Sequence, residues 1–265
     1  MGAILLLVAV QRLTILSRLY ELSRDSSVLE SRPLQTLSTT AGDFEFPAFV
    51  FNGSGGGSDP LRLGFFSGIH GDEPAGVLAL IRLLEQVAKN PALAEGYRLF
   101  IYPACNPSGL LAGTRFSQHR KDLNREFWKN SSEPEVQWLE NGIRSECFHG
   151  LVSLHADDTS NGIYGFVRGA VLSKGLLEPA LKAAESILPR NTKPIIDGFP
   201  AVNGIISECY DGILTSPPEL HPQPFEVILE TPHLAPQEQQ VEALVRAMET
   251  ILREYRELLA FAANL

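Results

Sequence analysis

Short apolar runs alternate with longer segments of helical periodicity along most of this chain. In the last helical segment, Val241, Leu244 and Val245 fall on one apolar stripe. Strands that alternate with helices build a largely parallel sheet, because each crossover helix returns over one of its faces. The pattern predicts an α/β fold with a mostly parallel, mixed sheet covered by helices on both faces. The predicted strands are Phe44–Phe51 at an edge, Leu63–Phe66, Tyr97–Pro103, Leu151–Leu154, Ile163–Val167 and Phe225–Leu229, and the predicted helices are Ala75–Ala88, Ser132–Cys147, Gly175–Leu188 and a long one from Pro236 onward.

The chain is predicted to be one large domain that follows an N-terminal segment. Its 265 residues are enough for a single α/β domain with a sizeable core. We expect a helix and connector over residues 1–40 and one domain over residues 41–265. The apolar run Ala3–Val10 is too short to span a bilayer. The helical spacing of Leu13, Leu16 and Leu19 favours a packed or interfacial helix, with a cleaved or mis-assigned leader as the alternative.

Charge and cysteine usage exclude some classes of partner. The net charge is −9 and no run of Lys and Arg is present, which argues against a nucleic-acid partner. Cys105, Cys147 and Cys209 are scattered, and no spacing among them suggests a disulfide framework or a cysteine zinc site. We expect a reducing, cytoplasmic setting without membrane association. The oligomeric state is open.

Polar residues follow or end several of the predicted strands. His70, His155 and Glu230 each lie near the carboxyl end of an apolar run, and ligands bind at that edge of open α/β sheets. Glu73 follows His70 across a turn, and two imidazoles with a carboxylate and a water form an open catalytic zinc site. His70, Glu73 and His155 therefore predict a site for one zinc ion per chain. Glu230 suits the general base that takes a proton from the zinc-bound water.

A loop rich in cations lies between these elements, over residues 115–127. A guanidinium binds a carboxylate through two parallel hydrogen bonds, and an arginine beside a metal can stabilise an oxyanion. Structural interpretations stand beside these functional ones. The arginines could form loop salt bridges, Glu73 could be a first-turn helix carboxylate, and Asn124 could cap a turn.

Taken together, these motifs resemble the zinc carboxypeptidase superfamily, which includes carboxypeptidases, murein peptide amidases and the succinylglutamate desuccinylase–aspartoacylase group. The matching pieces occur in family order between about residues 62 and 232. They are the segments Gly68–Glu73, Asn106–Gly109, Asp122–Phe127, Ser132–Glu135, Ser153–His155 and Leu229–Pro232.

The resemblance implies a zinc carboxypeptidase-like fold and a zinc-hydrolase domain over residues 41–265. It implies Arg115 as carbonyl and oxyanion stabiliser, and Asn124 with Arg125 as the clamp for a substrate carboxylate. Family carboxypeptidases also use a mobile tyrosine ahead of the base. Tyr210 is the candidate here, and Tyr164 is its rival.

The implied substrate is a small peptide or an N-acyl amino acid with a free carboxylate. Desuccinylases and aspartoacylases carry a β-rich domain after the base, whereas 35 residues follow Glu230 here. We therefore expect a metallocarboxypeptidase or peptide amidase, with an N-acyl amino acid deacylase as the alternative. A non-enzymatic metal-binding module is the hypothesis from another class. Asp157 and Asp158 could face a substrate amine or cap a loop.

Overall fold

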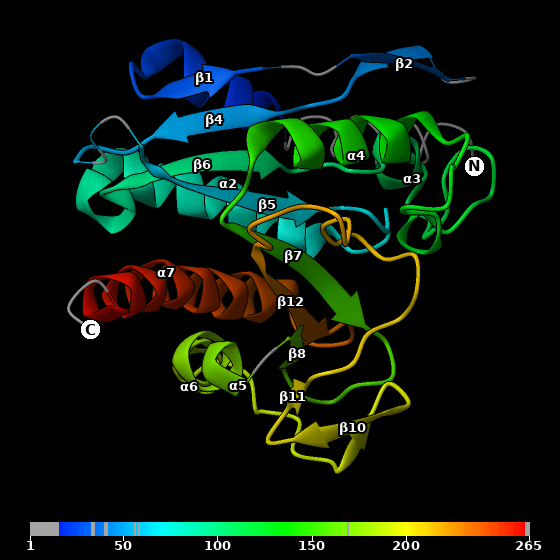
Figure 1. The fold of residues 1–265 in the computed structure, drawn as a ribbon. Helices are drawn as coiled ribbons and strands as arrows, with labels where there is room; N and C mark the ends of the chain where they lie inside the picture. Colours follow the sequence, from blue (N-terminus) through cyan, green and yellow to red (C-terminus); the bar gives the residue numbers. More distant parts are fainter. Residues whose placement is uncertain are drawn as a thin grey trace.

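A ten-stranded mixed sheet forms the centre of the molecule (Figure 1). The computed structural model describes residues 16–32, 35–39, 42–55, 57, 59–168 and 170–262. The strand order is β1-β4-β6-β5-β7-β12-β8-β11-β10-β9, and β2 and β3 form a separate hairpin. The strands are β1 (Leu29–Ser31), β2 (Thr36–Thr39), β3 (Gly42–Glu45), β4 (Phe49–Asn52), β5 (Leu61–Ser67), β6 (Tyr97–Tyr102), β7 (Gly150–Asp157), β8 (Tyr164–Val167), β9 (Ile195–Ile196), β10 (Phe199–Val202), β11 (Ile205–Ile206) and β12 (Phe225–Pro232).

The sheet has a parallel central block with an antiparallel pair on either side of it. Strands β6, β5, β7 and β12 run parallel to their neighbours in this central block. On one side β4 pairs antiparallel with β6 and β1, and on the other β8 pairs antiparallel with β12. The α/β class and the mixed sheet predicted from the sequence are confirmed. The carboxyl ends of β5, β7 and β12 therefore meet at one edge.

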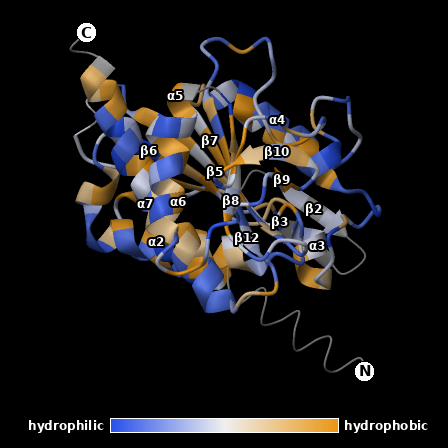
Figure 2. Ribbon diagram, turned by 90° about the horizontal axis from the view of Figure 1, so that it is seen from below, coloured by the Kyte–Doolittle hydropathy of each residue, from blue (hydrophilic) through white to orange (hydrophobic). Residues whose placement is uncertain are grey.

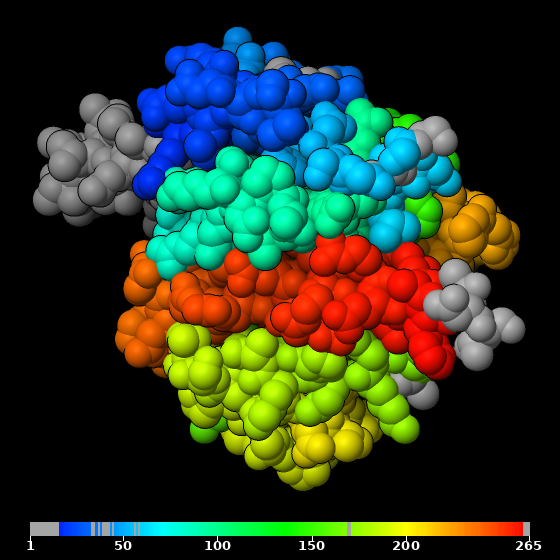
Figure 3. Space-filling model, turned by 90° about the vertical axis from the view of Figure 1, so that its left-hand side faces the viewer, coloured from blue at the N-terminus to red at the C-terminus, as the bar shows by residue number. Residues whose placement is uncertain are grey.

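Helices cover both faces of the sheet, as predicted. Seen from the side in Figure 3, α2, α7 and the α5–α6 segment form successive bands down one face. Their apolar side chains join those of the sheet in one large core. In Figure 2 the central strands are largely orange, the colour of hydrophobic residues. α4 covers the opposite face over a second core. The helices are α2 (Pro74–Lys89), η1 (Pro91–Ala94), α3 (Pro107–Ala112), η2 (Leu123–Arg125), α4 (Pro134–Glu146), α5 (Ala170–Leu172), η3 (Ser173–Leu177), α6 (Glu178–Ala184) and α7 (Gln237–Ala262).

Residues 16–25 form a further helix at the start of the described chain. Leu16 and Leu19 are buried in the large core, so this part of the N-terminal segment packs against the domain. The apolar run Ala3–Val10 lies outside the described residues. Among the helices that the structure describes, none combines the length and apolar character needed to cross a bilayer.

Two local predictions were wrong, and several short strands were not predicted. The strand expected over Phe44–Phe51 is split between β3 and β4, because Phe46–Ala48 leaves the extended ladder, and β4 is an inner strand since β1 covers it. The turn expected over Asn106–Gly109 after the preceding strand is instead the start of α3, with the Asn106 side chain accepting a hydrogen bond from the Gly109 N–H. Strands β9 to β11 were missed, because each is too short to show a pattern.

Candidate active site

Strand register brings the polar residues of β7, β8 and β12 into one row. Glu230 of β12 lies directly opposite His155 of β7 on one side and Tyr164 of β8 on the other. Residues in register on neighbouring strands point to the same face. Their neighbours Leu154 and Leu229 belong to the core beneath the helices, so His155 and Glu230 face away from it.

The turn between β5 and α2 carries His70 and Glu73 to the same place. Gly71 allows this turn to approach α3 closely, since a Cβ there would lie 1.9 Å from the backbone carbon of Gly109. The Gly71 N–H donates to the Thr114 carbonyl at 3.0 Å, which joins the turn to the loop that carries Arg115.

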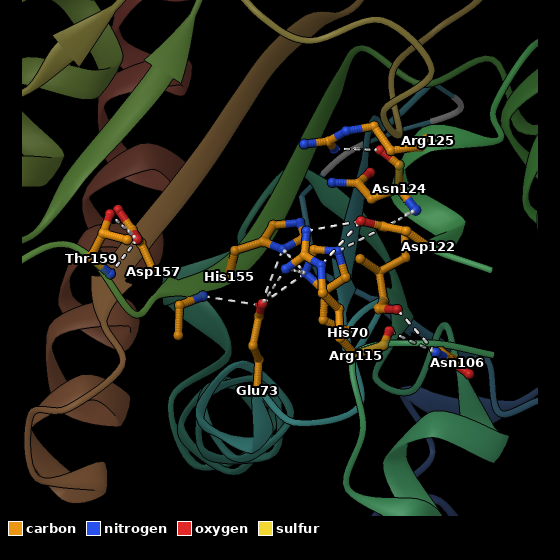
Figure 4. Close-up of polar contacts among 12 residues, drawn as sticks. His70, Glu73, Asn106, Arg115, Asp122, Asn124, Arg125, His155, Asp157 and Thr159 are labelled. Carbon is orange, nitrogen blue, oxygen red and sulfur yellow. Dashed lines mark hydrogen bonds and ion pairs between the residues drawn. The ribbon is translucent and has the colours of Figure 1, made fainter. Parts of the chain in front are cut away.

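His70, Glu73 and His155 form a compact buried group (Figure 4). Oε1 of Glu73 lies 2.7 Å from Nδ1 of His70, and Oε2 of Glu73 lies 3.2 Å from Nδ1 of His155. The two Nδ1 atoms are 3.3 Å apart. Within the described ranges, this is the one group of His, Cys, Asp and Glu whose ligand atoms all fall within 4.8 Å of one another.

The outer ring nitrogens of both histidines have their own partners. Nε2 of His70 lies 3.1 Å from Oδ1 of Asp122, and Nε2 of His155 lies 3.0 Å from the Ser153 hydroxyl. If each Nε2 carries the proton and donates it outward, both Nδ1 lone pairs point towards Glu73 and each other. In that state two lone pairs and a carboxylate converge, and Nη1 of Arg115 is the one cationic group beside them among the described residues, 3.3 Å from Nδ1 of His70. A metal ion bound among the three donors would stabilise the arrangement further. The donor set therefore fits a divalent metal ion.

The electrostatics of this group reflect burial and mutual charge. Burial would raise the pKa of Glu73, but the two histidines outweigh it and lower that pKa to about 2. Burial lowers the pKa of His155 below its usual value, against the opposing effect of Glu73. Burial would also lower the pKa of His70, but hydrogen bonds with Asp122 and Glu73 raise it instead. A carboxylate that stays ionised beside a neutral imidazole suits metal binding.

Asp122 connects the metal-ligand candidates to Arg115. Its Oδ2 accepts from Nε and Nη2 of Arg115, each at 3.0 Å, while its Oδ1 faces His70 and accepts from the Asn124 N–H at 3.0 Å. Nη1 of Arg115 lies 3.7 Å from Oε1 of Glu73. Asp122 lies in one of the matching motifs, but no role was predicted for it from the sequence. Its position two residues before Asn124 was the available signal.

Asn124 and Arg125 follow Asp122 in η2, and they line the same pocket as His70 and Glu73. The Asn124 side-chain oxygen accepts from the Leu214 N–H at 2.9 Å, and Nη1 of Arg125 donates to the Asn124 carbonyl at 2.7 Å. The Arg125 guanidinium stacks over the Tyr210 ring, with 4.4 Å between its central carbon and the ring centroid. The Tyr210 hydroxyl donates to the carbonyl and carboxylate of Asp197, at 2.7 and 3.0 Å.

The rival tyrosine has a different environment. Tyr164 is 1% exposed, and its hydroxyl donates to Oδ2 of Asp157 at 3.0 Å. The other oxygen of Asp157 accepts from the Thr159 N–H and hydroxyl, both at 2.7 Å. Asp157 thus caps its loop while it lines the pocket, and Tyr210 is the tyrosine that lies beside the arginine.

These side chains surround a pocket of about 330 Å³. Its lining includes His70, Glu73, Arg115, Asn124, Arg125, Tyr210 and Glu230. Glu230 is partly buried, and burial together with the negative charges of Glu73, Asp157 and Asp197 raises its pKa well above the usual value. A carboxyl with a raised pKa has the proton affinity that a general base needs near neutral pH.

The sequence and fold have known counterparts. Residues 61–161 match the model of the succinylglutamate desuccinylase/aspartoacylase catalytic domain. Human carboxypeptidase D is 32% identical over 110 residues, which cover 35% of this chain and 8% of that protein. The chain therefore corresponds to a small part of this relative's length.

Solved structures share the fold over nearly the whole chain. A candidate metallopeptidase from Shewanella amazonensis SB2B superposes with a TM-score of 0.77 at 21% identity, covering 90% of this chain and 91% of that one. A metallo-carboxypeptidase from Burkholderia cenocepacia gives 0.71 at 14% identity, covering 92% and 68%. The architecture is thus that of the metallocarboxypeptidases. The two sequence matches link part of the chain to the succinylglutamate desuccinylase/aspartoacylase catalytic domain and to a carboxypeptidase.

Proposed function

We propose that the protein is a zinc-dependent hydrolase that cleaves an amide or peptide bond next to a free carboxylate. The observation that carries this proposal is the convergence of two imidazole Nδ1 atoms and the Glu73 carboxylate beside a pocket lined by Glu230 and two arginines. His70, Glu73 and His155 would hold one zinc ion. Three protein ligands are the usual number at a catalytic zinc site, which keeps a position open for chemistry.

The proposed mechanism assigns one task to each side chain. Bound zinc would supply Lewis acidity, which acidifies water and polarises the scissile carbonyl. Glu230 accepts a proton from the attacking water and returns it to the leaving amine nitrogen. Arg115, fixed by Asp122, donates hydrogen bonds to the oxyanion that develops on the carbonyl. Asn124 and Arg125 hold the substrate carboxylate, and the Tyr210 ring positions the Arg125 guanidinium by stacking against it.

The second candidate function is that of an N-acyl amino acid deacylase. The family-model match to the desuccinylase/aspartoacylase catalytic domain favours it. Both candidates need the same base and the same carboxylate clamp, so mutation of Arg125 does not separate them. The acyl side of the substrate separates the two functions, because a peptidase must admit a chain there and a deacylase needs room only for a small acyl group. The cytoplasmic setting remains part of the proposal.

Zinc-loaded enzyme is expected to cleave short peptides or peptide-like amides with a free terminal carboxylate, and to leave N-succinylglutamate and N-acetylaspartate largely intact. A mass-spectrometric screen of both panels measures this. Matched peptides with an amidated C-terminus are the control, because they remove the charge that Arg125 would bind. Turnover of the small N-acyl amino acids alone would reverse the order of the two functions, and silence on every compound would favour a metal-binding module.

Replacing Asp122 with alanine is expected to weaken zinc binding by roughly 10- to 100-fold, the usual effect of removing a hydrogen-bond partner of a ligating histidine. Asp122 orients the His70 ring through Nε2. Competition with a chromogenic chelator measures the dissociation constant. Asp59→Ala, which removes an exposed partner of Arg62, is the control. Equal zinc affinity in both variants and the wild type would contradict the role assigned to Asp122.

A further inference from the structure

Glu133 is a buried carboxylate that lies outside the pocket and has no part in the proposed chemistry. It immediately precedes α4 and is 3% exposed. Its Oε2 accepts from the Ser117 hydroxyl at 2.8 Å, and both of its oxygens lie 3.2 Å from Nδ1 of His119. A buried carboxylate is costly unless hydrogen bonds compensate it, and the positive end of α4 adds stabilisation. The partners of this carboxylate come from the loop between α3 and α4.

Ser117 is the centre of a tight turn within that loop. Its hydroxyl oxygen accepts from the His119 N–H at 3.2 Å and faces the Lys121 N–H at 3.4 Å. Its own N–H donates to the Lys121 carbonyl at 2.9 Å. The backbone of Arg120 has a φ of 61°, a left-handed conformation that residues other than glycine rarely adopt. The turn is therefore held in one shape by a small set of hydrogen bonds that Glu133 completes.

The turn separates Arg115 from Asp122, and these two residues pair with each other at the metal-ligand group (Figure 4). A displaced turn would move both members of the pair. Arg125 donates its N–H to the Asp122 carbonyl at 3.0 Å, but its segment has further contacts outside the turn, since Asn124 accepts from the Leu214 N–H and the Phe127 N–H donates to the Gly212 carbonyl. Glu133 thus binds the turn of residues 117–121, whereas the segment that carries Arg125 has further contacts with residues 212 and 214.

We propose that Glu133 is a positioning residue, which holds the turn of residues 117–121 against α4 and thereby sets the place of Arg115 and Asp122. For its effect on turnover this inference rests on the proposed function, but its effect on the loop does not. Because Arg115 acts on the developing oxyanion and Arg125 binds the ground-state carboxylate, loss of Glu133 should reduce kcat more than it raises KM.

The chain offers a matched control in the same helix. Glu135 is 1% exposed, and within the part of the chain that the structure describes neither of its carboxylate oxygens has a hydrogen-bond partner. Glu135→Gln therefore changes an equally buried carboxylate that makes no hydrogen bond to the loop. Ser117→Ala removes the hydroxyl from the other side of the contact. Glu133→Gln keeps an oxygen acceptor for Ser117.

The experiment measures amide hydrogen exchange of the loop in zinc-loaded protein, together with kcat and KM on a cleaved substrate from the two panels. Glu133→Ala and Ser117→Ala are expected to speed exchange over residues 117–122 roughly tenfold, because a buried hydrogen bond is lost. They should lower kcat roughly tenfold and change KM less than about threefold. Glu133→Gln should recover most of both effects, and Glu135→Gln should show neither.

If residues 117–122 of Glu133→Ala and Ser117→Ala exchanged their amide hydrogens as slowly as those of the wild type, the proposal would be overturned. An equal response of Glu135→Gln would overturn it too, since that would mean a general destabilisation of α4. If Glu133→Ala fails to fold, Ser117→Ala and Glu133→Gln still decide the question. If no compound is turned over by the wild type, the proposed function fails, while the exchange data still test the anchor.

Discussion

The Glu230→Gln variant is expected to keep its zinc and to lose turnover by about 10² to 10⁴-fold. Glutamine preserves the shape of the side chain but cannot accept a proton from water. Glu230 lies in register with His155 and lines the pocket, while burial and neighbouring carboxylates raise its pKa. The measurements are metal content of the purified variant and kcat/KM on a substrate that the wild type cleaves.

Glu226→Gln is the matched control for this variant. Glu226 lies on the same face of β12 as Glu230. Its Oε1 accepts hydrogen bonds from the N–H and the hydroxyl of Ser216, at 2.7 and 2.6 Å. Near-wild-type turnover is expected for this control. If Glu230→Gln kept full activity, the base would have to be another residue. If it lost its zinc, the lost activity would say nothing about proton transfer.

Purified His155→Ala is expected to contain almost no zinc, whereas the wild type should carry about one ion per chain. Removal of one of three protein ligands leaves two donors, which is too few for a stable zinc site. Loss of metal should also remove the zinc-dependent part of thermal stability, because an ion that binds only the folded state stabilises it. Elemental analysis and melting curves with and without a chelator measure both effects.

His149→Ala serves as the control for the metal experiment. His149 directly precedes β7, and its Nδ1 accepts from the Arg62 N–H at 3.0 Å, away from the candidate metal site. This variant should bind zinc like the wild type. Full zinc occupancy in His155→Ala would rule out His155 as a ligand, and loss of zinc from both variants would point to unfolding instead of a missing ligand.

Much of the fold follows from local patterns in the sequence. Helix α2 was predicted to within a residue of its observed ends, because Val77, Ile81 and Leu84 repeat with helical spacing after Pro74. The short strands β1 and β9 to β11 could not be predicted in this way. Each consists of two to four residues, and such segments are extended only because a neighbouring strand supplies their hydrogen bonds.

In the candidate site, too, some features follow from the sequence and others only from the tertiary structure. The sequence by itself determined that His70, Glu73, His155 and Glu230 would converge, because the carboxyl ends of parallel strands share one edge. Only the tertiary structure distinguished the surroundings of Tyr164 from those of Tyr210. Register with Glu230 directs Tyr164 into a buried contact with Asp157, whereas the loop after β11 places Tyr210 under Arg125. The roles of Asp122 and Glu133 depended on tertiary structure too, since hydrogen bonds between distant segments have no periodicity along the chain.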